Sequence, residues 1–390
     1  MMKTLVLTPS YPPNKQGGID KVVFEFAKQA KLNGHAMTVI SFQYNANTDI
    51  YTRVCVDTGF EIVEIKQESN KVETLVDWNC ENFLSDLIEL IAYKEFDCIV
   101  CHDWFLSELA IALCNKLGIP LISFIHAFKY EEYQGKLNAE RLAIHERQVQ
   151  MMKSSSRVIC LAENVKRSIS PFINQDIPID VIRCGMSKPH GLSSIAPSSS
   201  PITYYYHGRF TDDKNVMGLL ESFSMLSDNT QLVMRGQGKR ESDMRKFIQN
   251  HDLAHRIKLL PWCKDANVIS KDIQSSDVYV LASQYEPLGL SLMESIELGV
   301  PAVMPDCYGP NEIFNALKSG WQFSPRSGCT SLTNALKKAA AEVRPMRIRT
   351  LVNRWQCFSL FSWHSGYTNF FNLTTTTTTI QGKKSCQKAG

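Results

Sequence analysis

Tyr279-Val-Leu-Ala-Ser-Gln-Tyr-Glu-Pro-Leu-Gly-Leu-Ser-Leu-Met-Glu-Ser-Ile-Glu-Leu-Gly-Val-Pro-Ala-Val303 is the stretch of sequence that decides the fold. Its apolar start predicts a buried strand, Pro287 suits the beginning of a helix, and Gly299 suits the end of that helix before another strand. Glu286 therefore falls in the loop at the carboxyl end of a strand, and Glu294 lies one to two turns into the helix. Free backbone amides at a helix start attract anions, so the stretch predicts an anion site flanked by two carboxylates.

The same alternation of strand and helix recurs along the chain. Lys21 begins a helical pattern that ends at Asn33-Gly34, between the first two apolar runs. Repeated strand–helix–strand units of this length predict doubly wound parallel sheets. The predicted strands are 4–9, 36–42, 60–65, 96–101, 120–126, 157–161 and 179–184, followed by 202–207, 231–235, 257–260, 278–282 and 301–304.

A segment rich in Ser, Pro and Gly separates the two sets of strands and predicts a linker between two domains. The second set is followed by an aromatic-rich stretch and by six consecutive threonines. Ligands of open α/β sheets bind at the carboxyl ends of the strands, so we expect the site in a cleft that the two domains share. The predicted division is a first Rossmann-like domain 1–187, a linker 188–200, a second Rossmann-like domain 201–345, a helical segment 346–373 and a disordered tail 374–390.

Composition and charge favour small-molecule chemistry in a globular protein. The 390 residues are 44% hydrophobic and 21% charged, and the formal net charge is only +3, which argues against a dedicated nucleic-acid binder. No apolar run is long enough to span a bilayer and no signal peptide is evident, so we expect a cytoplasmic protein. Residues 343–390 carry seven basic and no acidic residues, which makes peripheral contact with the inner face of an anionic membrane a hypothesis.

Twelve cysteines are scattered without framework spacing, as in a reduced intracellular protein. Cys98 and Cys101 form a Cys-x-x-Cys that could be a redox dithiol or half of a zinc site. They lie in a predicted buried strand, where positions i and i+3 point to opposite faces, and no second ligand pair completes a metal site. We therefore interpret both thiols as core.

Cations suited to phosphate follow the first strand of the second domain. Arg209 supplies a planar fork for two phosphate oxygens, and Lys214 supplies a compact ammonium. In the first domain, Gly17 and Gly18 precede the predicted first helix and allow close approach of backbone to a ligand.

Together these motifs resemble the retaining glycosyltransferases of family 4. The resemblance covers the chain to about residue 373, and its most specific element is Glu286-Pro-Leu-Gly-Leu-(x)3-Glu294 followed by Gly-Val-Pro. The resemblance implies the GT-B fold, in which two doubly wound Rossmann-like domains face a central cleft. The first domain would take the acceptor and the second the nucleotide-sugar donor. The remaining matches are 12–18, Gly34-His35, Gly208-Arg209 with Lys214, Gly236-Gln-Gly238, Gly309-(x)2-Glu312 and Phe361-Ser-Trp363.

The resemblance also implies roles for single residues. Arg209 and Lys214 would hold the donor diphosphate, with Gly17 and Gly18 also against the phosphates, and Glu286 would contact the transferred sugar. The other implied donor-site residues are Leu288, Gly289 and Leu290 at the helix start, Glu294 at the ribose hydroxyls, and the catalytic His126 beside the sugar. His102, Asp103 and Trp104 follow another predicted strand and are expected on the acceptor side.

The implied function is retaining transfer of a hexosyl group from a nucleotide-diphosphate sugar to a glycan or lipid-linked glycan, as in polysaccharide biosynthesis. Growing charge on the leaving diphosphate would be stabilised by cations and amides, and no metal or other cofactor is expected, since the sequence contains no Asp-x-Asp. A nucleotide-sugar epimerase of the same fold is an alternative that the Glu-(x)7-Glu element disfavours. A non-catalytic nucleotide-sugar-binding protein is a second alternative.

Overall fold

The computed structural model describes residues 1–13, 17–44, 50–67, 81–91, 94–189 and 201–388. The chain divides into two compact units, each with its own sheet. Unit 1 comprises residues 1–184 together with 363–390, and unit 2 comprises residues 185–362. Most of the predicted linker, residues 190–200, lies outside the described residues.

Unit 1 contains a sheet in the order β3-β4-β2-β1-β5-β6-β7-β8, parallel except for the β3–β4 pair. The central strands are apolar on both faces, and all five residues of β5 are buried, as expected for a sheet covered by helices on both sides. The strands are β1 Lys3–Thr8, β2 Ala36–Tyr44, β3 Ile50–Val54, β4 Glu61–Gln67, β5 Cys98–His102, β6 Leu121–Ile125, β7 Arg157–Cys160 and β8 Ile179–Val181.

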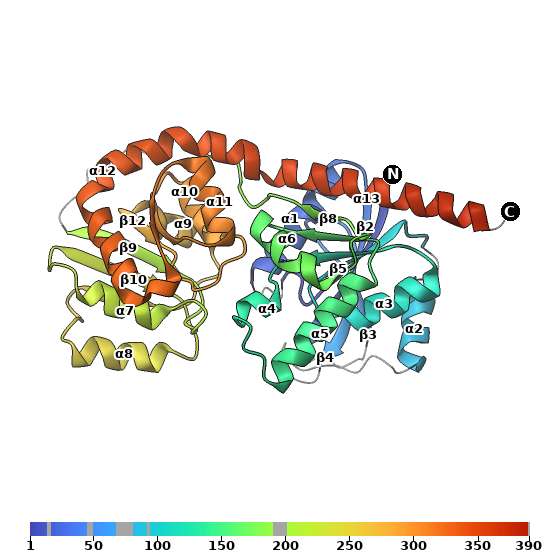
Figure 1. Ribbon diagram of the computed structural model, residues 1–390, viewed down its shortest axis with the longest axis horizontal. Coiled ribbons are helices and arrows are strands. Elements are labelled where there is room, and N and C mark those ends of the chain that lie inside the picture. The colour runs from blue at the N-terminus through green and yellow to red at the C-terminus, as the bar shows by residue number, and fades with distance from the viewer. Residues whose placement is uncertain (14–16, 45–49, 68–80, 92–93, 190–200, 389–390) are drawn as a thin grey trace. The chain divides into compact units, whose positions relative to one another are not determined.

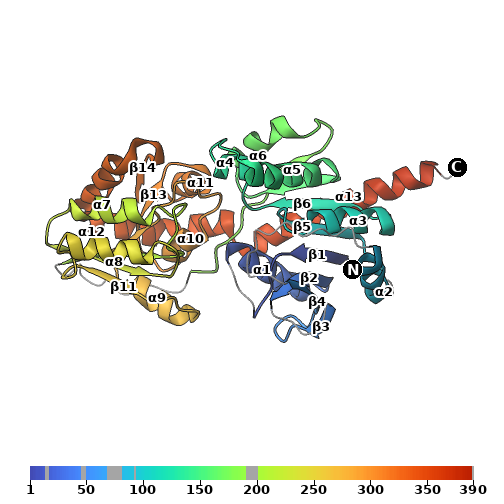
Figure 2. The same ribbon diagram turned by 90° about the horizontal axis from the view of Figure 1, so that it is seen from below.

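The helices of unit 1 cover the two faces of that sheet. Helices α1 and α13 contact each other on one face and α3 and α5 on the other, and Figure 2, seen from below, shows α3 and α5 in front of the sheet and α13 behind it. They are α1 Gly18–Leu32, α2 Glu81–Ile91, α3 Ser107–Leu117, α4 Lys129–Glu132, α5 Ala139–Lys153, α6 Glu163–Ile169, a 3-10 turn Ser170–Phe172, and α13 Trp363–Lys388.

Unit 2 contains an all-parallel sheet in the order β11-β10-β9-β12-β13-β14. Helices α7 and α8 lie on one face and α9 and α10 on the other (Figure 1). The strands are β9 Ile202–His207, β10 Thr230–Arg235, β11 Ile257–Leu260, β12 Val278–Val280, β13 Ala302–Pro305 and β14 Trp321–Phe323. The helices are α7 Val216–Ser224, α8 Glu241–Asn250, α9 Ala266–Gln274, α10 Leu290–Glu297, α11 Tyr308–Leu317, a 3-10 turn Pro325–Ser327, and α12 Gly328–Phe361.

The C-terminal end differs from the sequence-based prediction. Residues 328–361 form one helix of unit 2 with Pro345 inside it, and α13 returns to unit 1 and packs on α1. Thr374 and Thr377 are buried, and the Arg157 Nε donates to Thr377 Oγ1 at 2.8 Å. The prediction that residues 374–390 are disordered is therefore wrong for the threonine run. The hydroxyls of Thr374 and Thr377 donate to the carbonyl oxygens of Phe370 and Leu373 one turn earlier, and both side chains are buried.

Two strands lie outside the predicted set. Strand β3 is the antiparallel edge of the first sheet, and β14 is a three-residue edge of the second. Strand β3 is largely exposed, and β14 has only three residues, of which Trp321 and Phe323 are buried, so neither gives an apolar run long enough to predict a strand. Among the described residues, no helix combines the length and apolarity that crossing a bilayer requires.

Candidate functional site

Two oppositely charged side chains meet at the carboxyl ends of neighbouring strands in unit 2. Strands β9 and β12 are adjacent and parallel, so the loops that follow them emerge at the same edge of the sheet. Lys214 comes from the loop after β9, and Glu286 comes from the loop after β12. The Lys214 Nζ lies 2.8 Å from Glu286 Oε2, with side chains 21% and 13% exposed. The fold thus brings together the predicted diphosphate cation and the predicted sugar-binding carboxylate.

The environment of Lys214 keeps its ammonium charged. Burial lowers the pKa of Lys214, but Glu286 and Asp213 outweigh that effect, so its net pKa lies above the ordinary value. Burial raises the pKa of Asp213, but Lys214 and Arg209 outweigh it in the opposite direction, so Asp213 is ionised. Arg209 is 64% exposed and its Nη2 lies 3.3 Å from Asp213 Oδ2. This loop therefore presents two cations at one edge, one half-buried and one exposed.

The glycines around this loop permit a close backbone crossing. A Cβ on Gly236 would lie 2.0 Å from the carbonyl oxygen of Gly208, and one on Gly238 would lie 2.4 Å from the carbonyl oxygen of Phe210. The Phe210 amide donates to the Gln237 carbonyl at 2.8 Å. The Gly-x-Gly after β10 is therefore explained by contact with the loop that carries Arg209 and Lys214.

Glu286 also touches the start of α10. Its Oε1 accepts a hydrogen bond from the Gly289 amide at 3.2 Å, and Gly289 precedes the helix with a φ of 90° that favours glycine. A Cβ on Gly309 would lie 2.5 Å from the carbonyl oxygens of Pro287 and Leu288. The loop between Glu286 and Leu290 is thus packed from the side of α11. Leu288 is buried and Leu290 is half-buried.

Glu294 projects from the middle of α10 to strand β9. Its Oε2 lies 3.0 Å from the His207 Nε2, the last residue of that strand. The Nδ1 of His207 is buried and has no hydrogen-bond partner among the described residues. Glu294 is 28% exposed, so part of its carboxylate remains open for a ligand hydroxyl.

Buried contacts from α12 hold the far end of α10. Arg354 Nη1 donates to the carbonyl oxygen of Glu297, the last residue of α10, at 2.8 Å. A Cβ on Gly299 would lie 2.2 Å from the Leu351 side chain, so α12 packs directly on the turn that ends α10. Sequence patterns do not reveal Arg354, His207 or Asp213 as members of this site, because each acts through a contact with a residue distant in sequence.

In unit 1, the predicted His126 pairs with the predicted His102. Strand β5 ends at His102, and His126 follows the neighbouring strand β6. His102 Nδ1 lies 2.8 Å from His126 Nε2, and both rings stack on Phe124. Burial lowers the pKa of His126 to about 3, and burial followed by the nearby His126 lowers the pKa of His102 well below its usual value. Both rings are therefore neutral, each with one N–H, and in the contact one ring donates its N–H to the unprotonated nitrogen of the other.

Asp103 fixes the loop that follows His126. Its Oδ1 accepts from the His126 amide at 3.0 Å and from Gln148 Nε2 at 3.3 Å. Gln148 also donates to the Ala127 carbonyl at 2.9 Å and accepts from the Lys129 amide at 2.9 Å. Burial raises the pKa of Asp103 to about 7, although the charge of Lys129 and the backbone amides of His126 and Ala127 act in the other direction. Gln148 is a further residue that the sequence pattern does not reveal, since it lies inside an ordinary helix.

Trp104 and the two glycines have different exposures. Trp104 is 2% exposed, stacks on Phe105 and keeps its indole nitrogen inside the protein, so only a small part of its ring is accessible. Gly17 and Gly18 are exposed at the start of α1, and a Cβ on Gly17 would meet no atom within 4 Å. The Gly17 amide donates to Asp20 Oδ2 at 2.9 Å, which ties the glycine turn to α1. Residues 14–16 of this turn lie outside the described residues.

The two cysteines of the Cys-x-x-Cys lie in strand β5, all of whose residues are buried. Cys98 and Cys101 are buried in β5 as free thiols. Burial raises the pKa of Cys98 to about 12 and that of Cys101 further, so neither is a reactive thiolate. Within the described ranges, no group of three or more His, Cys, Asp or Glu side chains is placed to hold a metal ion.

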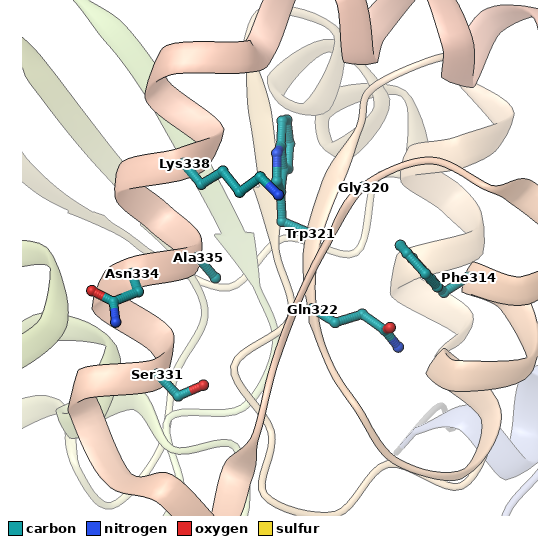
Figure 3. Close-up of a pocket in the computed structure, with 8 residues that line it drawn as sticks. All are labelled: Phe314, Gly320, Trp321, Gln322, Ser331, Asn334, Ala335 and Lys338. Atoms are coloured by element: carbon teal, nitrogen blue, oxygen red, sulfur yellow. The ribbon is translucent and has the colours of Figure 1, made fainter.

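A separate pocket of about 300 Å³ lies between α11, β14 and α12 (Figure 3). Its polar side chains are largely engaged: Trp321 Nε1 donates to Glu342 at 3.1 Å and Gln322 Nε2 donates to Asn311 at 3.1 Å. The pocket contains none of the predicted site residues, so it is not the candidate site. Its lining residues are Phe314, Gly320, Trp321, Gln322, Ser331, Asn334, Ala335 and Lys338.

Comparison with known proteins identifies the class. Residues 16–188 match the model of Glycosyltransferase Family 4, and residues 193–346 match that of Glycosyl transferases group 1. Sucrose-phosphate synthase from Thermosynechococcus elongatus superposes with a TM-score of 0.80 at 15% identity, over 96% of this chain and 99% of that one. HepE from Anabaena, in complex with UDP and glucose, gives 0.75 at 14% identity, over 96% and 100%. The two units therefore form a GT-B fold, as predicted.

Proteins related in sequence are also glycosyltransferases. Glycogen synthase from Mycobacterium tuberculosis is 21% identical over 384 residues, which cover 93% of this chain and 92% of that protein. The chain belongs to the family 4-like glycosyltransferases of the GT-B fold. This confirms the predicted enzyme class.

Proposed function

We propose that the chain transfers a hexosyl group from a nucleotide-diphosphate sugar to a glycan or lipid-linked glycan acceptor, with retention of anomeric configuration. The observation that carries the proposal is the contact of Lys214 with Glu286, which also accepts from the amide of Gly289 immediately before α10. A cation, a carboxylate and a helix start converge there, as a charged donor with a polyhydroxyl group requires.

The leaving group sets the electrostatic requirement. When the bond between the anomeric carbon and the diphosphate oxygen breaks, both electrons stay on that oxygen. Lys214, Arg209 and the start of α10 then stabilise the charge that develops, and they do so more strongly in the transition state than in the ground state. These groups belong to the protein, and we propose that no metal ion is needed in addition.

The sugar and the nucleotide have separate partners in the proposal. When the donor binds, the ammonium of Lys214 pairs with the diphosphate in place of Glu286, and the carboxylate of Glu286 then accepts hydrogen bonds from sugar hydroxyls. Glu294 accepts hydrogen bonds from the two hydroxyls of the ribose. His126 lies beside the transferred sugar. The acceptor oxygen bonds to the anomeric carbon on the face that the diphosphate leaves, and its proton passes to the departing phosphate. A nucleotide-sugar donor is supported by the similar protein HepE, whose structure was solved with UDP and glucose.

The test uses the full chain with UDP-glucose, GDP-mannose and ADP-glucose, with and without EDTA. We expect one donor to release its nucleoside diphosphate, first slowly to water and faster with a soluble oligosaccharide, at the same rate with EDTA. Proton NMR of the first product should show the anomeric configuration of the donor. An inverted product, an epimerised donor, or tight donor binding with no turnover on any acceptor would each contradict the proposal.

A further inference from the structure

Two arginines in the C-terminal half of α12, Arg347 and Arg354, point inward. Arg347 and Arg354 are 6% and 2% exposed, and each donates to the carbonyl oxygen of a residue at or after a helix end. Arg347 Nη1 reaches Ser276 at 2.9 Å beyond α9, and Arg354 Nη1 reaches Glu297 at 2.8 Å at the end of α10. These cations stabilise carbonyls that helices leave without partners. The contacts that attach this part of α12 to unit 2 therefore include side chains of its inner face, and the side chains of its outer face are not needed for them.

The outer face of the same segment carries a row of apolar side chains. Ile348, Val352 and Trp355 are 49%, 67% and 45% exposed, and their spacing of four and three residues places them in one row along the helix. Figure 1 shows this half of α12 along the outside of unit 2. Four of the exposed large apolar side chains in the described part of the chain, these three and Leu360, lie on this one helix segment. A soluble surface helix normally has the opposite arrangement, with charge outside.

Positive charge borders the apolar row. Arg344 and Arg349 are exposed beside Ile348, and no acidic residue occurs between residue 343 and the end of the chain. The aromatic residues further along, Trp363, Tyr367 and Phe370, are buried in unit 1 and are not available for contacts outside. The large exposed apolar side chains in the described part of this region lie on α12.

We propose that the outer face of α12 docks on an anionic phospholipid surface. An apolar row with a tryptophan, bordered by arginines and free of carboxylates, fits the boundary between acyl chains and phosphate headgroups. Trp355 has the amphipathic ring that suits this depth. The inference is independent of the transfer chemistry, because these side chains are exposed, whereas Arg354 and Leu351 are the residues of α12 that reach the end of α10.

The test measures binding of the full chain to vesicles of phosphatidylcholine and phosphatidylglycerol in equal amounts, and to vesicles of phosphatidylcholine alone. We expect binding to the anionic vesicles only, weakened at least tenfold by the combined change Ile348→Ser, Val352→Ser and Trp355→Ser. Arg344→Gln with Arg349→Gln should weaken it and make it insensitive to salt. The matched control is Met225→Ser with Trp262→Ser, which removes two apolar side chains exposed elsewhere on unit 2 and should leave binding unchanged.

Two outcomes would overturn the inference. Equal binding by the triple variant and the wild type would show that another surface is responsible. Self-association of the wild type that the triple variant loses, with no vesicle binding by either, would assign the face to a second copy of the chain. Turnover of a nucleotide sugar with a soluble acceptor should be the same in both proteins, so failure here is distinct from failure of the proposed function.

Discussion

At the residue scale, unit 1 contains a hydrogen bond between two buried imidazoles, His102 and His126. Because both pKa values are lowered, neither ring is charged near neutral pH, and each nitrogen of the pair acts either as donor or as acceptor. The bond fixes the ring of His126 and the position of its proton. His102 thus acts on the proposed donor-sugar contact through His126.

The role of His102 is tested by two substitutions. His102→Phe keeps an aromatic ring on Phe124 but leaves the His126 Nε2 buried without a partner, which should cost about 1–3 kcal/mol of unfolding free energy. His102→Asn retains polar atoms near the position of Nδ1 and should restore the nitrogen-15 shifts of the His126 ring. Identical ring shifts in wild type and His102→Phe would show that the pair does not set the proton position.

Asp103 predicts a specific pH dependence. Its folded-state pKa of about 7 exceeds the usual aspartate value of about 4, so between these two pH values only the unfolded chain has released the proton. The contribution of Asp103 to the unfolding free energy should therefore fall as pH rises through this window, by at most roughly 4 kcal/mol. The difference in unfolding free energy between wild type and Asp103→Asn, measured by urea titration from pH 4 to 8, should show this fall. A pH-independent difference would contradict it.

At the element scale, α10 is held at both ends. Glu286 and the Gly309 contact fix its start, and Arg354 from α12 binds the carbonyl at its end. The position and tilt of α10 determine where the backbone amides at its start and the carboxylate of Glu294 lie in the candidate site. Long-range contacts therefore set the geometry of a motif that is contiguous in sequence.

Replacement of Arg354 tests this support. Arg354→Met keeps most of the apolar stem and removes the donor, so the Glu297 carbonyl loses a charge-assisted hydrogen bond in a buried place. We expect a loss of about 2–3 kcal/mol in unfolding free energy and a higher KM for the donor. Arg349→Met, exposed on the same helix, is the control and should stay within about 0.5 kcal/mol of wild type. Equal unfolding free energies of the two variants would show that Arg354 does not support the end of α10.

The sequence predicts the elements near the site better than the elements at the edges. The strand, loop and helix around Glu286 follow from local apolar patterns and from Pro287 and Gly299, and the structure confirms the helix at Leu290–Glu297. Strand β3 escapes prediction because most of its residues are exposed, and β14 because it has only three residues. His207 and Gln148 escape prediction because their partners are 87 and 45 residues away in the chain.

At the scale of the whole molecule, the last helix belongs with the first unit. Chain order suggests a detached tail, whereas α13 packs on α1 and Thr377 binds Arg157. Whether a terminal segment is covered by a distant surface is not encoded in its own composition. A run of identical threonines is ambiguous between tail and helix for that reason.

Truncation tests this packing. Removal of residues 374–390 exposes the surface that covers Thr374 and leaves the Arg157 Nε without its Thr377 partner. We expect a lower Tm and faster hydrogen exchange in the strands and helices of unit 1, while unit 2 keeps its protection. Unchanged exchange in β7, which contains Arg157, would indicate that the threonine helix does not stabilise unit 1.

The central claim is that donor cleavage depends on the Lys214 ammonium beside Glu286. The most direct measurement is the steady-state rate of nucleoside diphosphate release from the preferred donor by wild type, Lys214→Met and Lys258→Met, an exposed lysine of the same unit. We expect Lys214→Met to lose a factor of about 10² to 10³ in kcat while its far-UV circular dichroism and Tm stay close to wild type. Lys258→Met should remain within about twofold of wild type. A folded Lys214→Met protein with wild-type kcat would contradict the account.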